Sequence, residues 1–422
     1  MQVKTLILGA GLTGLSTAYH LEKTGDKDYL LVEKQALPGG LCQSTYQNGF
    51  TYDYGGHLLH LHTPYGKKLV KELLKNNCAR LTRQAFVDFP FARVPYPIQG
   101  NLWALPQKER TLCARGLQKR ATFKNIKTFK QWCLAHFGQG LYDLFFKPYN
   151  TKLWGISPSQ MTAEWCASFV PMPTAAQIKK SLRAPISKKL GYNAFFYYPK
   201  QGGIGALAGA LADKLSHLQL STPVTAVNLK RKVATLGNKT LHFERLVNTL
   251  PLPVFMRLVQ GEKELKARAK KLKAAPVTIY HLAVNRRVQP FSWIYFPGKE
   301  VPFFRVGLQS SFGKENAPRD ASLFYIELPG IQKPSKALEK KIWNALVQKG
   351  IIKQEDRPLL KAWQTVAHAY AIFDKNRTQA VDFLLARLAQ KGCLSAGRYG
   401  RWEYSFMESA LLAGKALATK IL

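Results

Sequence analysis

The distribution of apolar residues predicts a strand, a helix and a second strand at the start of the chain. Residues 3–8 are mostly apolar, and a run of this length is typical of a buried parallel strand. We expect a helix over residues 12–23, followed by a short apolar strand that ends at Glu33. This order predicts an α/β fold whose first two strands lie parallel in one sheet.

The rest of the chain divides into helical and strand-like regions. Residues 64–80 have the pattern of an amphipathic helix, and helical stretches dominate residues 104–190. Apolar and polar residues alternate from 276 to 328, which indicates a second sheet, and a final helix is expected from about residue 406. Between these regions we expect short strands at residues 224–227, 233–235 and 241–243.

Glycines mark the turn between the first strand and the first helix. Gly9, Gly11 and Gly14 form the pattern GxGxxG, in which the glycines allow a tight turn, a close approach by pyrophosphate and close helix–strand packing. The helix that follows points its first N–H groups at such an anion. Glu33 lies 22 positions after Gly11, where a carboxylate can accept a hydrogen bond from a ribose hydroxyl. The segment therefore predicts a dinucleotide site.

Further glycines indicate that the dinucleotide is FAD. Gly40 follows the second strand, and the turn Gly55-Gly56-His57 comes later. These glycines provide more places for a cofactor to approach the backbone closely than a plain NAD-binding unit needs. The glycine-rich turn around Arg398, before the last helix, offers another helix N-terminus to the cofactor.

We expect a Rossmann-like FAD-binding domain that is discontinuous in sequence, with an inserted helical domain and a second mixed or antiparallel sheet. The FAD-binding parts are predicted at residues 1–75, 191–275 and 351–422. A mainly helical substrate domain is predicted at residues 76–190, and a substrate-side β-sheet domain at residues 276–350.

Composition narrows the class of protein. A chain of 422 residues with 46% hydrophobic and 12% aromatic residues is globular, and it contains no apolar stretch long enough to cross a membrane. The six cysteines are scattered, which argues against a disulfide framework and favours a reducing cytoplasm. No metal site is expected, because His57, His60 and His62 have no carboxylate or thiol at ligand spacing. We expect these histidines to line the flavin pocket, with His57 nearest the ring.

The formal net charge of +37 leaves two interpretations open. It could serve an acidic partner, including peripheral contact with an anionic surface, or the lysines could decorate solvated helices. Runs such as 263–273 lack the aromatic interleaving of single-strand binders, so we favour solvated helices and expect no specific nucleic-acid partner.

Several longer strings of this sequence resemble the flavin-dependent UDP-galactopyranose mutases, especially the eukaryotic-type branch. They include GAGLTGL at the start, YDYGGH, VPYPIQGN, FGQGLYDLFFKPYNTKLW, YNAFFYYPKQGGIGAL and GRYGRWEY. The resemblance implies an isomerase that uses reduced FAD without net redox, with NAD(P)H as a candidate external reductant. In that mechanism flavin N5 attacks the anomeric carbon, displaces UDP and forms a flavin–sugar adduct, after which the sugar ring opens and recloses at the smaller size. A role in cell-surface polysaccharide biosynthesis follows from the same resemblance.

The resemblance also assigns residues. Those expected to hold the cofactor are Gly9, Gly11, Gly14, Glu33, Gly40, Gly55, Gly56, His57, Arg398 and Tyr404. Those expected at the diphosphate of a UDP-sugar are Asn193, Tyr295, Arg305, Tyr370 and Tyr404. Those expected around its uracil are Tyr96, Ile98, Gln99, Phe145, Asn150 and Trp154. The catalytic residues implied are His57, Arg83 and Arg305, close to the flavin ring and the sugar.

One departure from the family keeps an alternative open. A second arginine of the diphosphate clamp should fall at Phe169, and its loss removes a charge-assisted partner unless Lys179, Lys180 or Arg183 substitutes. The alternative function is an FAD-dependent oxidoreductase of the amine-oxidase or protoporphyrinogen-oxidase type, acting on an apolar or amine substrate. A third, non-enzymatic hypothesis is a flavin-stabilised protein that binds anionic surfaces through its charge.

Overall fold

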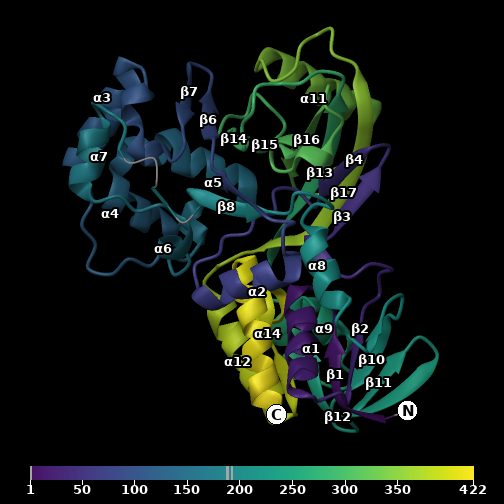
Figure 1. Cartoon of the computed structure of the whole chain (residues 1–422). Coiled ribbons are helices and arrows are strands. Elements are labelled where there is room, and N and C mark those ends of the chain that lie inside the picture. Colours follow the sequence, from purple (N-terminus) through teal and green to yellow (C-terminus); the bar gives the residue numbers. More distant parts are fainter. Residues whose placement is uncertain (1, 187–189, 192) are drawn as a thin grey trace.

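The computed structural model describes residues 2–186, 190–191 and 193–422. Figure 1 shows three regions: one sheet with its helices beside both chain ends, a second sheet beyond it, and a helical lobe to one side. No helix in the described ranges is long and apolar enough to cross a membrane.

The first sheet combines strands from the start, the middle and the end of the chain. Its strand order is β10-β11-β12-β1-β2-β9, with β18 also paired to β12. β1 runs parallel to β2 and β12, as the opening pattern predicts, whereas β10, β11 and β12 are antiparallel to one another. The bounds are β1 Gln2–Leu8, β2 Tyr29–Val32, β9 Leu218–Gln219, β10 Val224–Asn228, β11 Val233–Leu236, β12 Lys239–Asn248 and β18 Cys393–Ser395.

Helices from both ends of the chain pack together beside this sheet (Figure 1). The first helix and the last helix approach closely, because a Cβ added at Gly414 would lie only 2.5 Å from the Cβ of Ser16. The helices of this region are α1 Leu12–Thr24, α2 Pro64–Leu74, α8 Gly205–Ala212, α9 Leu252–Leu258, α10 Lys263–Ala269, α12 Arg377–Gln390, α13 Gly397–Gly400 and α14 Met407–Ile421.

The second sheet has the strand order β17-β13-β16-β15-β14-β6-β7. Its pairs are antiparallel except for β14 with β6, so the predicted mixed sheet is confirmed. Helix α11 Lys336–Gln348 packs its apolar residues against this sheet. The bounds are β6 Ala85–Phe89, β7 Ala92–Pro95, β13 Ala274–Val284, β14 Trp293–Tyr295, β15 Arg305–Leu308, β16 Ser322–Pro329 and β17 Pro358–Ala371.

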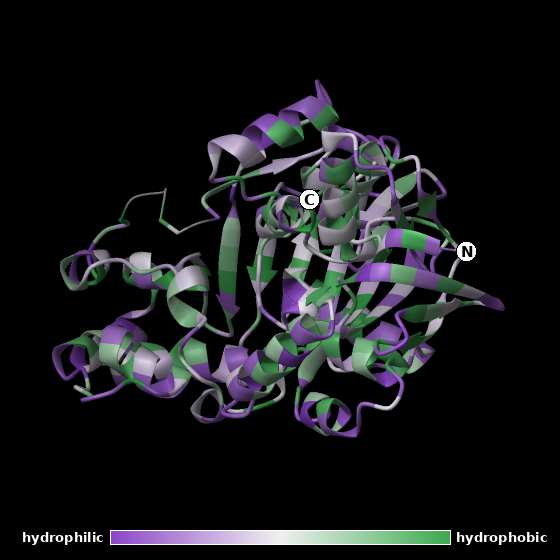
Figure 2. Cartoon of the chain, turned by 90° about the horizontal axis from the view of Figure 1, so that it is seen from below, coloured by the Kyte–Doolittle hydropathy of each residue, from purple (hydrophilic) through white to green (hydrophobic). Residues whose placement is uncertain are grey.

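The helical lobe lies between residues 98 and 181 and has an aromatic core. Phe129, Phe137 and Phe146 are buried there, with the rings of Phe137 and Phe146 stacked 4.8 Å apart. Figure 2 shows hydrophobic and hydrophilic residues intermixed along these helices, as expected for helices with one buried face. Its elements are η2 Ile98–Gly100, η3 Leu102–Ala104, α3 Gln107–Gln118, α4 Phe129–Leu141, the π-helix η4 Tyr142–Phe146, α5 Lys147–Trp154, η5 Pro158–Gln160, α6 Cys166–Phe169 and α7 Ala175–Ser181.

The helix predicted over residues 64–80 is too long. It ends at Leu74, and residues Ala79–Thr82 form β5, which pairs with β8 Phe195–Tyr198. This pairing joins segments more than a hundred residues apart, so local periodicity could not reveal it. The remaining elements are η1 Gly40–Cys42, η6 Gln309–Ser311, η7 Lys314–Asn316 and the hairpin of β3 Ser44–Gln47 with β4 Phe50–Asp53.

Candidate active site

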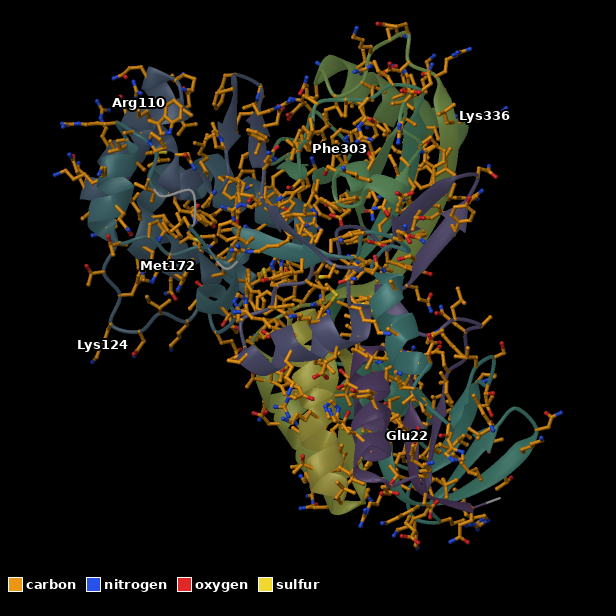
Figure 3. All side chains as sticks on the ribbon, viewed as in Figure 1. Glu22, Arg110, Lys124, Met172, Phe303 and Lys336 are labelled. Atoms are coloured by element: carbon orange, nitrogen blue, oxygen red, sulfur yellow. The ribbon has the colours of Figure 1, made fainter. Side chains whose placement is uncertain are left out.

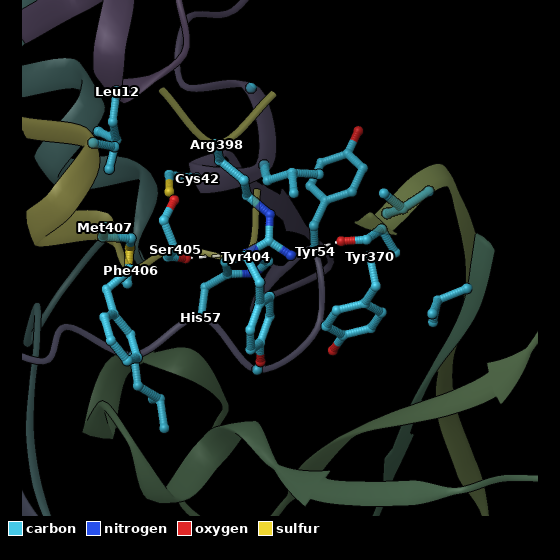
Figure 4. Close-up of a pocket in the computed structure, with 18 of the residues that line it drawn as sticks. Leu12, Cys42, Tyr54, His57, Tyr370, Arg398, Tyr404, Ser405, Phe406 and Met407 are labelled. Atoms are coloured by element: carbon cyan, nitrogen blue, oxygen red, sulfur yellow. Dashed lines mark hydrogen bonds between the residues drawn. The ribbon is translucent and has the colours of Figure 1, made fainter. Parts of the chain in front are cut away.

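A large cavity runs from the N-terminus of α1 to the second sheet. Its volume is about 260 Å³, and it is open to solvent. It is lined by Gly11, the turn at Gly40, the Gly56-His57 turn, the end of β17 and the segment that leads into α14. Figure 4 shows Leu12 at one end of this cavity and Tyr370 toward the other. An extended ligand could therefore reach from the first sheet to the second.

The glycine turn has the geometry that a pyrophosphate requires. Gly9 has a φ of +95°, and a Cβ added at Gly14 would lie 2.0 Å from the carbonyl oxygen of Gly9. A Cβ at Gly11 would meet no atom within 4 Å, and Gly11 lines the cavity. Gly11 is also the N-cap of α1, and no side chain caps this helix end. The first N–H groups of α1 therefore suit an anion in the cavity.

Glu33 stabilises this turn through hydrogen bonds with the backbone. Its buried carboxylate accepts hydrogen bonds from the backbone N–H of Ala10 (3.0 Å) and of Gln35 (3.0 Å). Glu33 is not among the residues that line the cavity, so its contact with a ribose stays a prediction. What the structure does show is that Glu33 stabilises the backbone on which the predicted pyrophosphate would lie.

The turn at Gly55 and Gly56 presses against the second sheet. A Cβ at Gly56 would lie 2.6 Å from the hydroxyl oxygen of Tyr325, and one at Gly55 would lie 2.7 Å from Oε1 of Glu327. His57 follows, and its buried Nδ1 has no hydrogen-bond partner in the described part of the chain. Burial, with the nearby Arg398 and Arg305 charges, lowers the pKa of His57 to about 4. A neutral imidazole therefore lines the cavity.

Arg398 is the cation beside His57 in this cavity (Figure 4). It donates to the carbonyl oxygens of Ser405 (3.0 Å) and Ala369 (2.7 Å), and its guanidinium lies 4.8 Å from the centre of the Tyr404 ring. The glycine turns, the neutral His57 ring and this cation together fit a dinucleotide with a flavin ring at the far end. The residues that would hold it are Gly11, Gly40, Gly56, His57, Arg398 and Tyr404.

Arg305 lies on the wall of this cavity and is paired. It sits directly opposite Glu327 in the β15–β16 ladder and donates to both carboxylate oxygens, one at 2.7 Å. Its second contact is with the hydroxyl of Tyr370 at 3.5 Å. Burial opposes the charge of Arg305, but Glu327 and Tyr370 outweigh it and hold the pKa above its usual value. The arginine expected at the diphosphate is thus already neutralised.

Glu327 was not among the site residues predicted from the sequence, although one feature of the sequence indicates it. It is the only charged residue in the apolar run 322–329, most of which lies in the region expected to form the second sheet. A buried carboxylate requires a partner, and Arg305 begins the neighbouring strand in register with it.

A second, smaller cavity adjoins the first on the side of the helical lobe. It is lined by five of the six residues predicted around the uracil: Tyr96, Gln99, Phe145, Asn150 and Trp154. The sixth, Ile98, is buried and does not line it. The two cavities share a wall formed by Tyr295, Arg305, Tyr370 and Tyr404.

Arg83 reaches the larger cavity through another residue. It donates to Oδ1 of Asn193, which lines that cavity, and to the carbonyl oxygen of Leu190 at 3.1 Å. Its guanidinium also lies 5.1 Å from the centre of the Tyr96 ring. Arg83 lines neither cavity itself, so it is placed to orient Asn193 and Tyr96.

Phe169 lines the second cavity at the position where a cation was expected. Its ring lies 4.1 Å from that of Tyr404, and the two extend the aromatic wall formed with Trp154. The three basic residues considered as substitutes, Lys179, Lys180 and Arg183, are exposed and line neither cavity. Among the described residues, no group of His, Cys, Asp and Glu could hold a metal ion.

Comparison with known proteins agrees with this geometry. Residues 12–422 match the family model of flavin containing amine oxidoreductases. A solved structure of reduced UDP-galactopyranose mutase is 26% identical and superposes with a TM-score of 0.93 over 100% of this chain and 94% of that one. A solved Exiguobacterium structure, provisionally identified as a protoporphyrinogen oxidase, is 14% identical over 99% of this chain and 98% of that one, and its TM-score of 0.77 shows the shared fold.

Curated sequences align over shorter stretches. A probable UDP-galactopyranose mutase of Klebsiella pneumoniae is 25% identical over 175 residues, or 37% of this chain and 42% of that protein. A 15-cis-phytoene desaturase of Glycine max is 30% identical over 120 residues, or 25% of this chain and 21% of that protein. The chain thus spans less than half the length of these relatives in the alignments. The resemblance to UDP-galactopyranose mutases is confirmed mainly by the full-length structural match.

Proposed function

The chain belongs to the family of flavin containing amine oxidoreductases, and we propose that it is an FAD-dependent isomerase of the UDP-galactopyranose mutase type. Its reaction would interconvert the pyranose and furanose forms of a UDP-hexose. One observation carries this proposal: the two cavities meet at the wall of Tyr295, Arg305, Tyr370 and Tyr404. A nucleotide in the smaller cavity would therefore bring its sugar to the cofactor in the larger one.

The cofactor supplies one part of the chemistry. When bound in its reduced form, with NAD(P)H as a candidate reductant, FAD would supply the nucleophile at N5. The chain has to bind the nucleotide, aim the anomeric carbon and exclude water. Tyr96, Asn150 and Trp154 provide an aromatic slot with a polar edge, which suits a uracil ring.

Tyrosine hydroxyls would meet the diphosphate. Burial raises the pKa of Tyr295 and of Tyr370, so both hydroxyls stay protonated at neutral pH and are available as hydrogen-bond donors to a ligand. Fixed donors aimed at a departing diphosphate stabilise the charge that develops on it. Arg305 adds a cation, although Glu327 offsets it. The site therefore relies more on neutral donors than the resemblance implies.

The alternative function is an FAD-dependent oxidoreductase acting on an apolar or amine substrate. The observation in its favour is Phe169, which makes one end of the smaller cavity aromatic where a clamp for diphosphate would carry a cation. An apolar substrate would gain from that surface, whereas a diphosphate would not.

Binding of UDP to the purified protein tests the proposal. UDP would be titrated into the oxidised and the dithionite-reduced holoprotein while the flavin absorbance is followed. We expect saturable binding that is lost in Arg305→Ala and in Trp154→Ala. Trp103→Ala serves as the matched control, because Trp103 is 38% exposed on the same lobe and lines neither cavity.

Two results would contradict the proposal. Absence of UDP binding in both redox states would exclude the mutase function, and bleaching of the flavin by an amine or apolar substrate would then support the oxidoreductase. Binding that survives Trp154→Ala would place the nucleotide elsewhere.

A further inference from the structure

Lys152 is held by backbone carbonyl groups from another part of the fold. It lies on helix α5, and its ammonium nitrogen donates to the carbonyl oxygens of Phe296 (3.2 Å), Gly298 (2.6 Å) and Val301 (3.0 Å). The three carbonyls belong to the loop 296–304 between β14 and β15. Within the described ranges, Lys152 forms no ion pair with a carboxylate.

The two elements joined by this contact lie next to, or carry, residues that line the smaller cavity. On α5, Asn150 and Trp154 flank Lys152 two residues away on either side and line that cavity. The loop 296–304 starts directly after Tyr295 and ends directly before Arg305, which line both cavities. Figure 3 shows side chains filling the space between α5 and the strands near Phe303. The contact therefore joins the helix that carries the nucleotide slot to the loop beside the shared wall.

We propose that Lys152 is a positioning residue whose ammonium group fixes α5 to the loop 296–304 and thereby maintains the spacing of the nucleotide slot. This inference deepens the proposed function and rests on it, because the ligand whose binding depends on the spacing is the nucleotide. Lys152 itself lines neither cavity, so it acts through Asn150 and Trp154 on one side and through Tyr295 and Arg305 on the other.

The contact depends on the charge of the lysine. An ammonium group has three N–H donors, one for each carbonyl oxygen. A neutral amine has two donors and a lone pair, so it would leave one carbonyl facing a second electron-rich atom. The charged groups around it are Glu300 on the loop and Lys349 at the end of α11, which pairs with Asp88 on β6 at 2.9 Å and with Glu300 at 3.3 Å. Asp88 also accepts from Arg93 at 2.9 Å.

These surroundings place the loss of charge within an accessible pH range. Burial lowers the pKa of Lys152 to about 8, Glu300 raises it, and Lys349 lowers it further. Because the pKa in the contact lies below that of a solvated lysine, a rise in pH through this value does not release the contact. The proposal therefore rests on the three hydrogen bonds and on the residues that they join.

The first test measures UDP affinity at neutral pH in four proteins. They are the wild type, Lys152→Met, Lys152→Arg and the control Lys147→Met, which replaces an exposed lysine on the same helix. The control should bind UDP as tightly as the wild type. Lys152→Met should bind on the order of 10- to 100-fold more weakly, because a small misplacement of binding groups has effects of this size. Lys152→Arg keeps the charge and several N–H donors, so it should recover part of the affinity.

The second test does not need the nucleotide. Amide hydrogen exchange of residues 296–304 and of α5 would be compared in the holoprotein forms of the wild type and Lys152→Met. We expect faster exchange of both segments in Lys152→Met, because the three hydrogen bonds that join them are absent. Equal exchange in the two proteins would overturn the proposal for Lys152. So would an unchanged UDP affinity in Lys152→Met.

The two tests separate the two proposals. If no protein in the series binds UDP, the mutase function fails, and the exchange data still decide whether Lys152 fixes the loop. If the wild type binds UDP and Lys152→Met matches it, the mutase function stands and Lys152 has no positioning role. Equal flavin content in all variants would show that they are folded.

Discussion

Replacing Glu327 with glutamine separates the structural role of the Arg305–Glu327 pair from its effect on the ligand. The side chains of the two residues are only 18% and 5% exposed, and the pair is bidentate. Removing one partner of a buried pair costs about 3–5 kcal/mol, because the remaining charge is left uncompensated. Glutamine keeps one oxygen to accept from Arg305, so we expect a loss of about 3 kcal/mol.

The same change should strengthen the binding of UDP. A phosphate bound to Arg305 would lie on the order of 6 Å from the Glu327 carboxylate, which repels it by about 2–3 kcal/mol at an effective dielectric constant of about 20. Screening by water reduces this, and a gain of about 1.4 kcal/mol already corresponds to tenfold tighter binding. Glu327→Gln is therefore expected to unfold more easily and to bind UDP at least about tenfold more tightly.

A double-mutant cycle provides the assay. Guanidinium unfolding and UDP titration would be measured for the wild type, Glu327→Gln, Arg305→Gln and the double variant, with Glu315→Gln as an exposed control. The double variant should recover most of the stability lost in the single variants, because no buried charge remains. A variant Glu327→Gln that is as stable as the wild type, or that binds UDP more weakly, would refute the view that Glu327 offsets Arg305.

Three further predictions concern other parts of the chain. Gly14→Ala should yield protein whose absorbance shows no bound flavin, because the added Cβ would lie 2.0 Å from the Gly9 carbonyl oxygen. The control Gly209→Ala adds a Cβ that would meet no atom within 4 Å, so it should keep the flavin and gain about 0.5–1 kcal/mol of stability in α8. Phe169→Arg should tighten UDP binding about tenfold at low salt, and Phe169→Leu should not, since only arginine adds a charge-assisted partner to the smaller cavity; calorimetry at two salt concentrations would show whether the gain is electrostatic. Burial lowers the pKa of His281 from 6.5 to about 4, with its bond to Gln364 opposing, so its neutral form stabilises the fold above about pH 6.5 and this contribution is lost as the pH falls toward 4. In His281→Gln, the urea concentration at the unfolding midpoint should depend less on pH across that range. An unchanged pH dependence would show that His281 is not the residue responsible.

Features that depend on neighbouring residues could be predicted from the sequence. The turn at Gly9 requires a positive φ, and Gly14 has no room for a side chain against it. Both constraints act within six residues, so they could be predicted from the strand–turn–helix pattern of the sequence. The strands of the second sheet between residues 276 and 328 followed in the same way from the alternation of apolar and polar residues. The strands β6, β7 and β17, which complete that sheet, lie outside this range.

Features that depend on distant pairing could not be predicted in this way. The helix expected through residue 80 ends at Leu74, and Ala79–Thr82 pair instead with β8 as the strand β5. Helical periodicity is a weak preference, and tertiary pairing overrides it. Ile98 likewise follows the motif of the uracil residues, yet packing turns it into the core.

By itself the sequence determined the chemistry available to this protein: a phosphate-binding turn, aromatic residues for a planar ring and a set of arginines. The tertiary structure decided how that chemistry is combined. It placed Glu327 opposite Arg305, brought two cavities to one shared wall and seated Lys152 on three carbonyls of a distant loop. Motifs record what a local segment can bind, whereas charge balance and spacing depend on which segments the fold brings into contact.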